Sequence, residues 1–380
     1  MQKFIDDELL AGAISVVLKD NEIVDYKTWG YADRDSRTAI NGNTIFRIYS
    51  NTKIITSVAA MCLYEEGKFD LEDPLEKYLP QFINFKVLKR GATDPAETED
   101  LQSPPTVKQV MSHQAGFSYG IFSESPVDTL YMERKVLHPG STLAELVDKL
   151  AELPLAYQPG ARFQYSVSTD ILARLVEIWS GMSFIDFLKE RIFTPLAMTD
   201  TDFHVPAGKH DRLATNYVPA DLMDPMKPGL NVQPDTPLSS FLEPKVLTSG
   251  GGGLVSTMSD YTSFIQMLIG EGRFNGVQIL KPGTVALMHS NQLPPGVQVQ
   301  LPNWVMPNTV FGIGLAIKTR PMAGEPVDAT DEFHWGGIAG THTWISPRAG
   351  IAALIFTQRF PGFCHEFSHE FKRQVYKAMT

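Results

Sequence analysis

The chain has 380 residues, of which 43% are hydrophobic, so it can bury a large core as one large domain or two closely packed ones. Its net charge of -10 argues against nucleic acid or an anionic membrane as the main partner, because either would require a basic face. A small molecule is the ligand that this composition favours.

Cysteine content and the N-terminal residues bear on the compartment. The chain has two cysteines, Cys62 and Cys364, which fit free thiols better than a disulfide framework. Acidic residues interrupt the apolar residues of the segment 1–8, and no bilayer-length apolar segment follows. We therefore expect a cytoplasmic protein without a signal peptide. Its oligomeric state is not determined by these features.

Strand-like segments lie towards both ends of the sequence, and helix-like segments lie between them. β-Branched and aromatic residues on either side of Asn21 predict a hairpin over residues 13–32. The apolar run Ile54 to Tyr64 predicts a buried helix, and residues 91–105 read as a charged loop. Apolar periodicity predicts four helices in the middle of the chain, over residues 106–111, 143–153, 170–179 and 183–193.

The C-terminal third returns to strand-like patterns. After a glycine run at 250–253, the sequence predicts a helix over 258–269, strands over 311–317, 341–346 and 351–357, and a closing helix over 365–379. This order predicts an α/β (α+β) protein, with one antiparallel sheet built from both termini, flanking helices and a mostly helical insertion. We expect a sheet domain of residues 1–80 and 245–380, a helical domain of residues 81–244, and the active site between them.

The predicted buried helix has an unusual polar start, Tyr49-Ser50-Asn51-Thr52-Lys53. One interpretation makes Ser50 the N-cap, but a capping box would place Glu or Gln where this chain has Lys53. Residues i and i+3 share a helix face, so the Lys53 ammonium is expected beside the Ser50 hydroxyl. Burial is expected to lower the pKa of Lys53 from about 10.4, so that it accepts or relays the serine proton.

Two further segments with unusual sequences follow this one along the chain. Tyr165 follows a Pro159-Gly160 turn and precedes a helix, and the segment 334–337, His-Trp-Gly-Gly, lies on a predicted strand. Alone, the tyrosine fits a core aromatic and the glycines fit a strand with a bulge, and Ser-x-x-Lys is a weak pattern. In this order the three segments resemble the motifs of the serine β-lactamase and penicillin-binding superfamily. The chain is most similar to class C β-lactamase-like esterases, also called family VIII carboxylesterases, and the resemblance extends to residues 111–119 and 250–257.

The resemblance implies roles for individual residues. Ser50 corresponds to the acylated nucleophile, Lys53 to its proton partner and Tyr165 to the general base. The oxyanion hole corresponds to the backbone N–H groups of Ser50 and Ile338. Substrate-binding positions correspond to Tyr119, Trp335, Gly336 and Gly337.

Two positions depart from the lactamase pattern. The third motif of the lactamases begins with a lysine that pairs with the drug's carboxylate, where this chain has Trp335, or His334 if the register slips by one. The second motif usually ends in Asn, where this chain has Val167. A charge-assisted hydrogen bond contributes about 1.5–3 kcal/mol, so each loss is expected to slow lactam turnover about tenfold to a hundredfold.

Two other motifs point to different chemistry. Residues 116–120 match Gly-x-Ser-x-Gly, but a predicted helix precedes Ser118 and a loop follows, the reverse of a nucleophile elbow. His365 and His369 match His-Glu-x-x-His, the spacing of zinc ligands on a helix, but an amphipathic closing helix explains the same residues.

The sequence therefore predicts a serine hydrolase that cleaves short-chain carboxylic esters through an acyl-Ser50 intermediate, with no metal or organic cofactor. Weak β-lactamase activity is compatible with this interpretation. The alternatives are a β-lactamase, a D-amino-acid peptidase, an acyltransferase, a penicillin-binding or sensing protein without turnover, and a zinc peptidase using His365 and His369.

Overall fold

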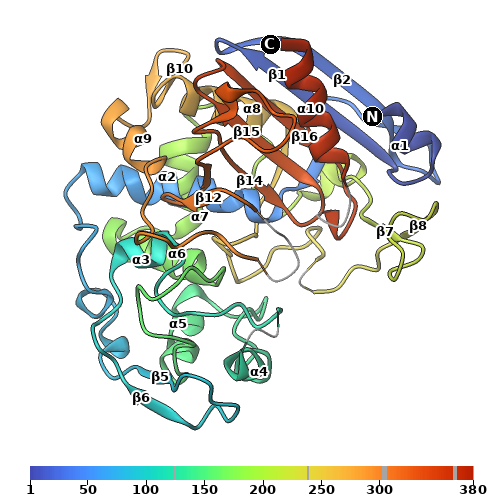
Figure 1. Ribbon diagram of the computed structural model, residues 1–380. Coiled ribbons are helices and arrows are strands. Elements are labelled where there is room, and N and C mark those ends of the chain that lie inside the picture. Colours follow the sequence, from blue (N-terminus) through green and yellow to red (C-terminus); the bar gives the residue numbers. More distant parts are fainter. Residues whose placement is uncertain (123–124, 238, 302–305, 363–365, 380) are drawn as a thin grey trace.

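The computed structural model describes residues 1–122, 125–237, 239–301, 306–362 and 366–379. An eight-stranded sheet runs in the order β12-β13-β14-β15-β16-β1-β2-β3, and neighbouring strands are antiparallel. The N-terminal hairpin thus pairs directly with the last strand of the chain (Figure 1). The strands are β1 Gly12–Lys19, β2 Glu22–Asp33, β3 Thr38–Ala39, β12 Thr309–Phe311, β13 Ala316–Lys318, β14 Phe333–Gly337, β15 Thr341–Ser346 and β16 Ile351–Phe356.

Four short two-stranded ribbons complete the β structure. They pair β4 Ile45–Arg47 with β9 Val255–Thr257, β5 Lys86–Leu88 with β6 Thr98–Asp100, β7 Tyr217–Pro219 with β8 Leu230–Val232, and β10 Arg273–Phe274 with β11 Val277–Gln278. The helices are α1 Gln2–Asp6, α2 Thr52–Glu65, α3 Val107–Met111, α4 Pro126–Glu133, α5 Leu143–Ala151, α6 Ser168–Ser180, α7 Phe184–Leu188, α8 Met258–Ile269, α9 Pro282–Met288 and α10 Phe367–Met379.

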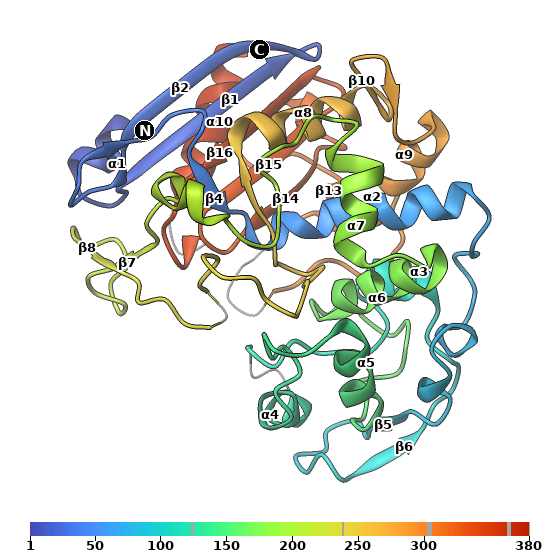
Figure 2. The ribbon, with the colours of Figure 1, turned by 180° about the vertical axis from the view of Figure 1, so that it is seen from behind.

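Helices cover both faces of the large sheet, which explains why β16 is apolar throughout and β1 is apolar along most of its length. On β1, Val17 packs with α10, whereas Val16 belongs to the core that also contains α2 and α8. Alternate residues of a strand point to opposite faces, so both sets must be apolar when both faces are covered. The helices α3 to α6 lie away from the sheet, and α2 runs between the two parts (Figures 1 and 2).

Most of the predicted elements are confirmed, and so is the fold class. The hairpin turns at Asp20 and Asn21, both with positive φ, as a two-residue hairpin turn requires. The predicted helix 183–193 forms as α7 followed by a π turn, Lys189–Phe193. The division into a sheet domain and a helical domain at residues 80 and 245 stays a prediction.

Two predictions of local structure were wrong. The strand expected over 311–317 is two strands, β12 and β13, because the chain turns between them at Gly314, whose φ is +77°. The loop expected over 91–105 contains β6, which gains its backbone partners from β5 and not from its own polar side chains.

Glycine at position 337 is required by close packing between β14 and the segment that precedes α2. A Cβ atom there would overlap the carbonyl oxygen of Ile48 and the hydroxyl of Thr341. Gly337→Ala is therefore expected to lower the free energy of unfolding by about 1–3 kcal/mol, the usual cost of overpacking. Denaturant unfolding measures this, with Gly283→Ala as the control, because a Cβ at that helical position meets open space. Equal stability of the two variants would contradict this packing account.

Candidate active site

Ser50 lies in a 3-10 turn, Tyr49–Asn51, that leads directly into α2. The turn is held from several sides: the Asn51 side chain donates to the Thr341 carbonyl at 3.0 Å, and Tyr261 donates to the Asn51 carbonyl at 3.0 Å. Tyr49 has a φ of +41°, an uncommon value for a residue with a side chain. Neither the turn nor α2 has a side-chain cap, so the N-cap interpretation of Ser50 is wrong.

Lys53 is completely buried one helical turn after Ser50. Its ammonium donates to the Gly251 carbonyl at 2.5 Å, to Ser50 Oγ at 3.3 Å and to the Tyr119 hydroxyl at 3.5 Å. It also lies 4.5 Å from the centre of the Tyr165 ring. The side chain thus points along the helix face towards Ser50, as the i, i+3 spacing predicts.

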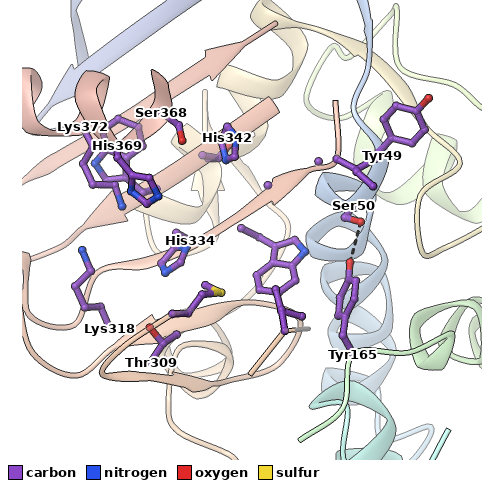
Figure 3. A pocket seen from close by; sticks show the side chains of 18 of the residues that line it. Tyr49, Ser50, Tyr165, Thr309, Lys318, His334, His342, Ser368, His369 and Lys372 are labelled. Atoms are coloured by element: carbon purple, nitrogen blue, oxygen red, sulfur yellow. Dashed lines mark hydrogen bonds between the residues drawn. The ribbon is translucent and has the colours of Figure 1, made fainter. Parts of the chain in front are cut away.

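Tyr165 approaches Ser50 from the other part of the molecule. Its chain segment leaves the Pro159-Gly160 turn and enters α6, and its hydroxyl donates to Ser50 Oγ at 2.8 Å (Figure 3). The ring is held by Tyr119, with ring centres 5.4 Å apart, and by His113 at 4.9 Å. The structure therefore brings together three residues that lie up to 115 positions apart in the sequence.

The expected direction of the Lys53 pKa shift was wrong. Burial alone lowers the pKa of Lys53, but the electrostatic interactions with Tyr119, Tyr165 and Asp170 together raise it above its ordinary value. For the Tyr119 phenol, burial acts in the opposite direction and raises the pKa, because it disfavours the phenolate. This direction of the pKa shift favours the ammonium form of Lys53, which can stabilise negative charge on its neighbours, whereas accepting a proton would require the free amine.

Ser50 and Tyr165 open onto a cavity of about 570 Å³. The other residues predicted at the site, Tyr119, Trp335, Gly336, Gly337 and Ile338, line the same cavity. Trp335 is nearly buried, and its ring centre lies 5.3 Å from that of Tyr165. Apolar side chains of Ile121, Phe122, Leu301, Met306 and Met322 form much of the remaining wall.

The opposite side of the cavity is polar, which the sequence analysis did not predict. Figure 3 shows Lys318, His334, His369 and Lys372 gathered across the cavity from Ser50 and Tyr165. Two lysines, Lys318 and Lys372, therefore line this cavity, although the third motif has Trp335 where the lactamases have a lysine. The residues come from β13, β14 and α10, so only the fold brings them together.

The two alternative motifs have structural explanations. Ser118 is buried, and its hydroxyl is hydrogen bonded to the Asp128 carboxylate and accepts from Gln164 at 3.0 Å. His369 lines the cavity, and His365 lies outside the described residues. Within the described ranges, no cluster of three or more His, Cys, Asp or Glu side chains is arranged to hold a metal ion.

Comparison with known proteins identifies the family. The sequence matches the family described as Beta-lactamase over residues 1–377. The chain belongs to this family. The predicted resemblance is thereby confirmed, and with it the assignment to the serine hydrolases of the β-lactamase fold.

The chain is similar in sequence to two known proteins and in fold to one solved structure. Protein Rv1367c of Mycobacterium tuberculosis is 31% identical over 368 residues, covering 95% of this chain and 89% of that protein. Esterase EstB of Burkholderia gladioli is 26% identical over 361 residues, covering 92% and 86%. The structure of EstCE1, a hydrolase with promiscuous acyltransferase activity, superposes with a TM-score of 0.81 at 24% identity, covering 99% of this chain and 96% of that one.

One buried acid at the site was not predicted from the sequence. Asp170, in the first turn of α6, accepts from Ser249 at 2.5 Å and from the Gly251 N–H at 3.1 Å. It thereby fixes the glycine segment whose Gly251 carbonyl accepts from Lys53. The glycine run 250–253 was a visible signal, but its partner on α6 was not.

The described residues include no helix long and apolar enough to cross a bilayer.

The raised pKa of Lys53 has a direct spectroscopic test. Because the ammonium form is stabilised, the Lys53 side-chain resonance is expected not to titrate between pH 6 and pH 10. Heteronuclear NMR of lysine-labelled protein measures this, and the spectrum of Lys53→Met assigns the signal. A titration midpoint well below 10 would restore the amine as a proton acceptor.

Proposed function

We propose that this chain hydrolyses short-chain carboxylic esters through an acyl-Ser50 intermediate. The observation that supports this best is the Ser50 hydroxyl lying within hydrogen-bond distance of both Tyr165 and Lys53 at the edge of an aromatic-lined cavity. This arrangement combines a nucleophile, a proton acceptor and a fixed positive charge. The substrate is a small-molecule ester, and neither a metal nor an organic cofactor takes part.

In the first step, Ser50 Oγ attacks the ester carbonyl carbon while its proton passes to the Tyr165 oxygen. For this step Tyr165 has first given up its own proton to solvent, so that Ser50 donates to the Tyr165 oxygen and the hydrogen bond between them is reversed. The Lys53 ammonium offsets the negative charge of the Tyr165 phenolate, which is neutralised when it accepts the Ser50 proton. The carbonyl oxygen becomes an oxyanion held by the backbone N–H groups of Ser50 and Ile338. Collapse of this intermediate breaks the ester C–O bond, and the alcohol leaves with the proton from Tyr165.

Water then attacks the acyl-Ser50 ester by the same path in reverse. Acyl transfer to an alcohol other than water, the promiscuous activity of EstCE1, is the second candidate function, because any hydroxyl compound that enters the cavity meets the same acyl group. An ester substrate needs no carboxylate partner beside the scissile bond, where the lactamases have a lysine and this chain has Trp335.

The nucleophile assignment is tested by covalent labelling. A fluorophosphonate is expected to add one equivalent to the protein, with the adduct lost in Ser50→Ala and retained in Ser118→Ala, because Ser118 is buried and committed to Asp128. Intact-mass spectrometry measures the adduct, and p-nitrophenyl butyrate turnover is expected to follow the same pattern. Labelling that survives in Ser50→Ala would refute the assignment.

The role of Tyr165 is tested by removing its hydroxyl. Tyr165→Phe keeps the ring packing but loses the proton acceptor, so kcat for p-nitrophenyl butyrate is expected to fall about a hundredfold or more. Tyr119→Phe serves as the control, because it also removes one phenol hydroxyl from the site. The Tyr119 hydroxyl contacts Lys53, whereas the Tyr165 hydroxyl contacts Ser50, so a smaller fall in kcat is expected for Tyr119→Phe. Near-wild-type kcat in Tyr165→Phe would move the proton transfer to another group.

A further inference from the structure

The polar side of the cavity has no part in the proposed acyl transfer. Lys318, His334, His369 and Lys372 face the cavity from the side opposite Ser50 (Figure 3). The cavity volume of about 570 Å³ lies within the range of about 300–1,000 Å³ that encloses drug-sized ligands. A substrate that fills it extends well beyond a short acyl group and reaches this polar side.

The two lysines of this cluster differ in how completely they are paired. Lys318 donates to both Glu325 oxygens at 2.7 Å and lies 3.3 Å from Glu332, so its three N–H donors have three acceptors. Lys372 has one carboxylate acceptor among the described residues, Glu332 at 2.5 Å. An ammonium has three donors, so Lys372 keeps donors available for a ligand.

The counter-ions lie behind the lysines. Glu332 is completely buried and also accepts from the Tyr376 hydroxyl at 2.7 Å, and neither it nor Glu325 lines the cavity. Glu366 does line it, but this residue is exposed to solvent, which screens its charge. A ligand on the polar side therefore meets the ammonium of Lys372 before any buried carboxylate.

The neighbouring imidazoles supply neutral hydrogen-bonding groups. Burial, with Lys372 nearby, lowers the pKa of His334 to about 3. His369 is exposed in part, and partial desolvation together with Lys372 lowers its pKa as well. Each neutral imidazole offers one N–H donor and one acceptor nitrogen. Together with the Ser368 hydroxyl, which lines the same wall, they surround Lys372 with groups that can bind oxygen atoms.

We propose that this cluster is a subsite for a carboxylate at the end of the substrate remote from the scissile ester, with Lys372 as its specificity-determining residue. The proposal rests on the proposed function and names its substrate class: esters whose acyl chain or alcohol ends in a carboxylate. Such a group forms a charge-assisted hydrogen bond with Lys372, and the chain between the two ends lies along the apolar wall.

Matched substrates test the subsite. One series consists of mono-p-nitrophenyl esters of dicarboxylic acids of increasing length, and a second of butyrate esters of ω-hydroxy acids. Each compound is compared with its neutral methyl-capped form. At the best length, kcat/KM of the wild type is expected to favour the free carboxylate about tenfold or more, mainly through KM, since charge-assisted hydrogen bonds are of that strength.

Variants on α10 assign the effect to one residue. Lys372→Met is expected to abolish the preference, taken as the ratio of kcat/KM for each free carboxylate to kcat/KM for its methyl-capped form, and Lys372→Arg is expected to restore part of it. Lys377→Met, at an exposed position of the same helix, is expected to change neither this ratio nor p-nitrophenyl butyrate turnover. Thermal unfolding of each variant confirms folding, and the wild-type comparison stands even if Lys372→Met fails to fold.

Two results would overturn the subsite. One is the lack of any carboxylate preference in both wild-type series, and the other is a preference that survives in folded Lys372→Met. Turnover of p-nitrophenyl butyrate in the wild type, lost in Ser50→Ala, separates these results from failure of the proposed function. The two series also show whether the carboxylate belongs to the acyl chain or to the alcohol.

Discussion

The burial of the Lys53 charge is the constraint on which the rest of the site depends. An ammonium taken out of water costs several kcal/mol unless partners replace its hydration. Here the partners are the Gly251 carbonyl, Ser50 Oγ and the two tyrosines 119 and 165. Each comes from a different segment of the chain, so the same contacts that stabilise the charge also assemble the site.

The fold supplies these partners from both of its parts. The sheet contributes β14, whose Gly337 allows the backbone before Ser50 to approach closely, and the middle of the chain contributes Tyr165 just before α6. Asp170 on α6 then fixes the glycine segment that accepts from Lys53. The Lys53 ammonium suits the stabilisation of a phenolate, in agreement with the proposal that Tyr165, whose hydroxyl lies 2.8 Å from Ser50 Oγ, is the proton acceptor.

The sequence predicts what depends on local spacing and on the order of motifs. Ser50 and Lys53 are three residues apart on one helix, so their proximity follows from helix geometry, and the ordered set of motifs locates Tyr165 and residues 334–337. It does not predict contacts between distant segments, such as Asp170 with Gly251 or Lys372 with Glu332. The sign of the Lys53 pKa shift was missed for the same reason, because the opposing interactions come from residues far along the chain.

The central claim is that an ester substrate acylates Ser50, and trapping that intermediate tests it most directly. Rapid acid quench after mixing enzyme with p-nitrophenyl acetate, followed by peptide mass spectrometry, should find one acetyl group on the peptide that contains Ser50. The burst of p-nitrophenol should match one equivalent of enzyme, and accumulation of the acetyl group requires that its hydrolysis be no faster than its formation. An acetyl group mapped to another residue, or a burst that persists in Ser50→Ala, would contradict the account.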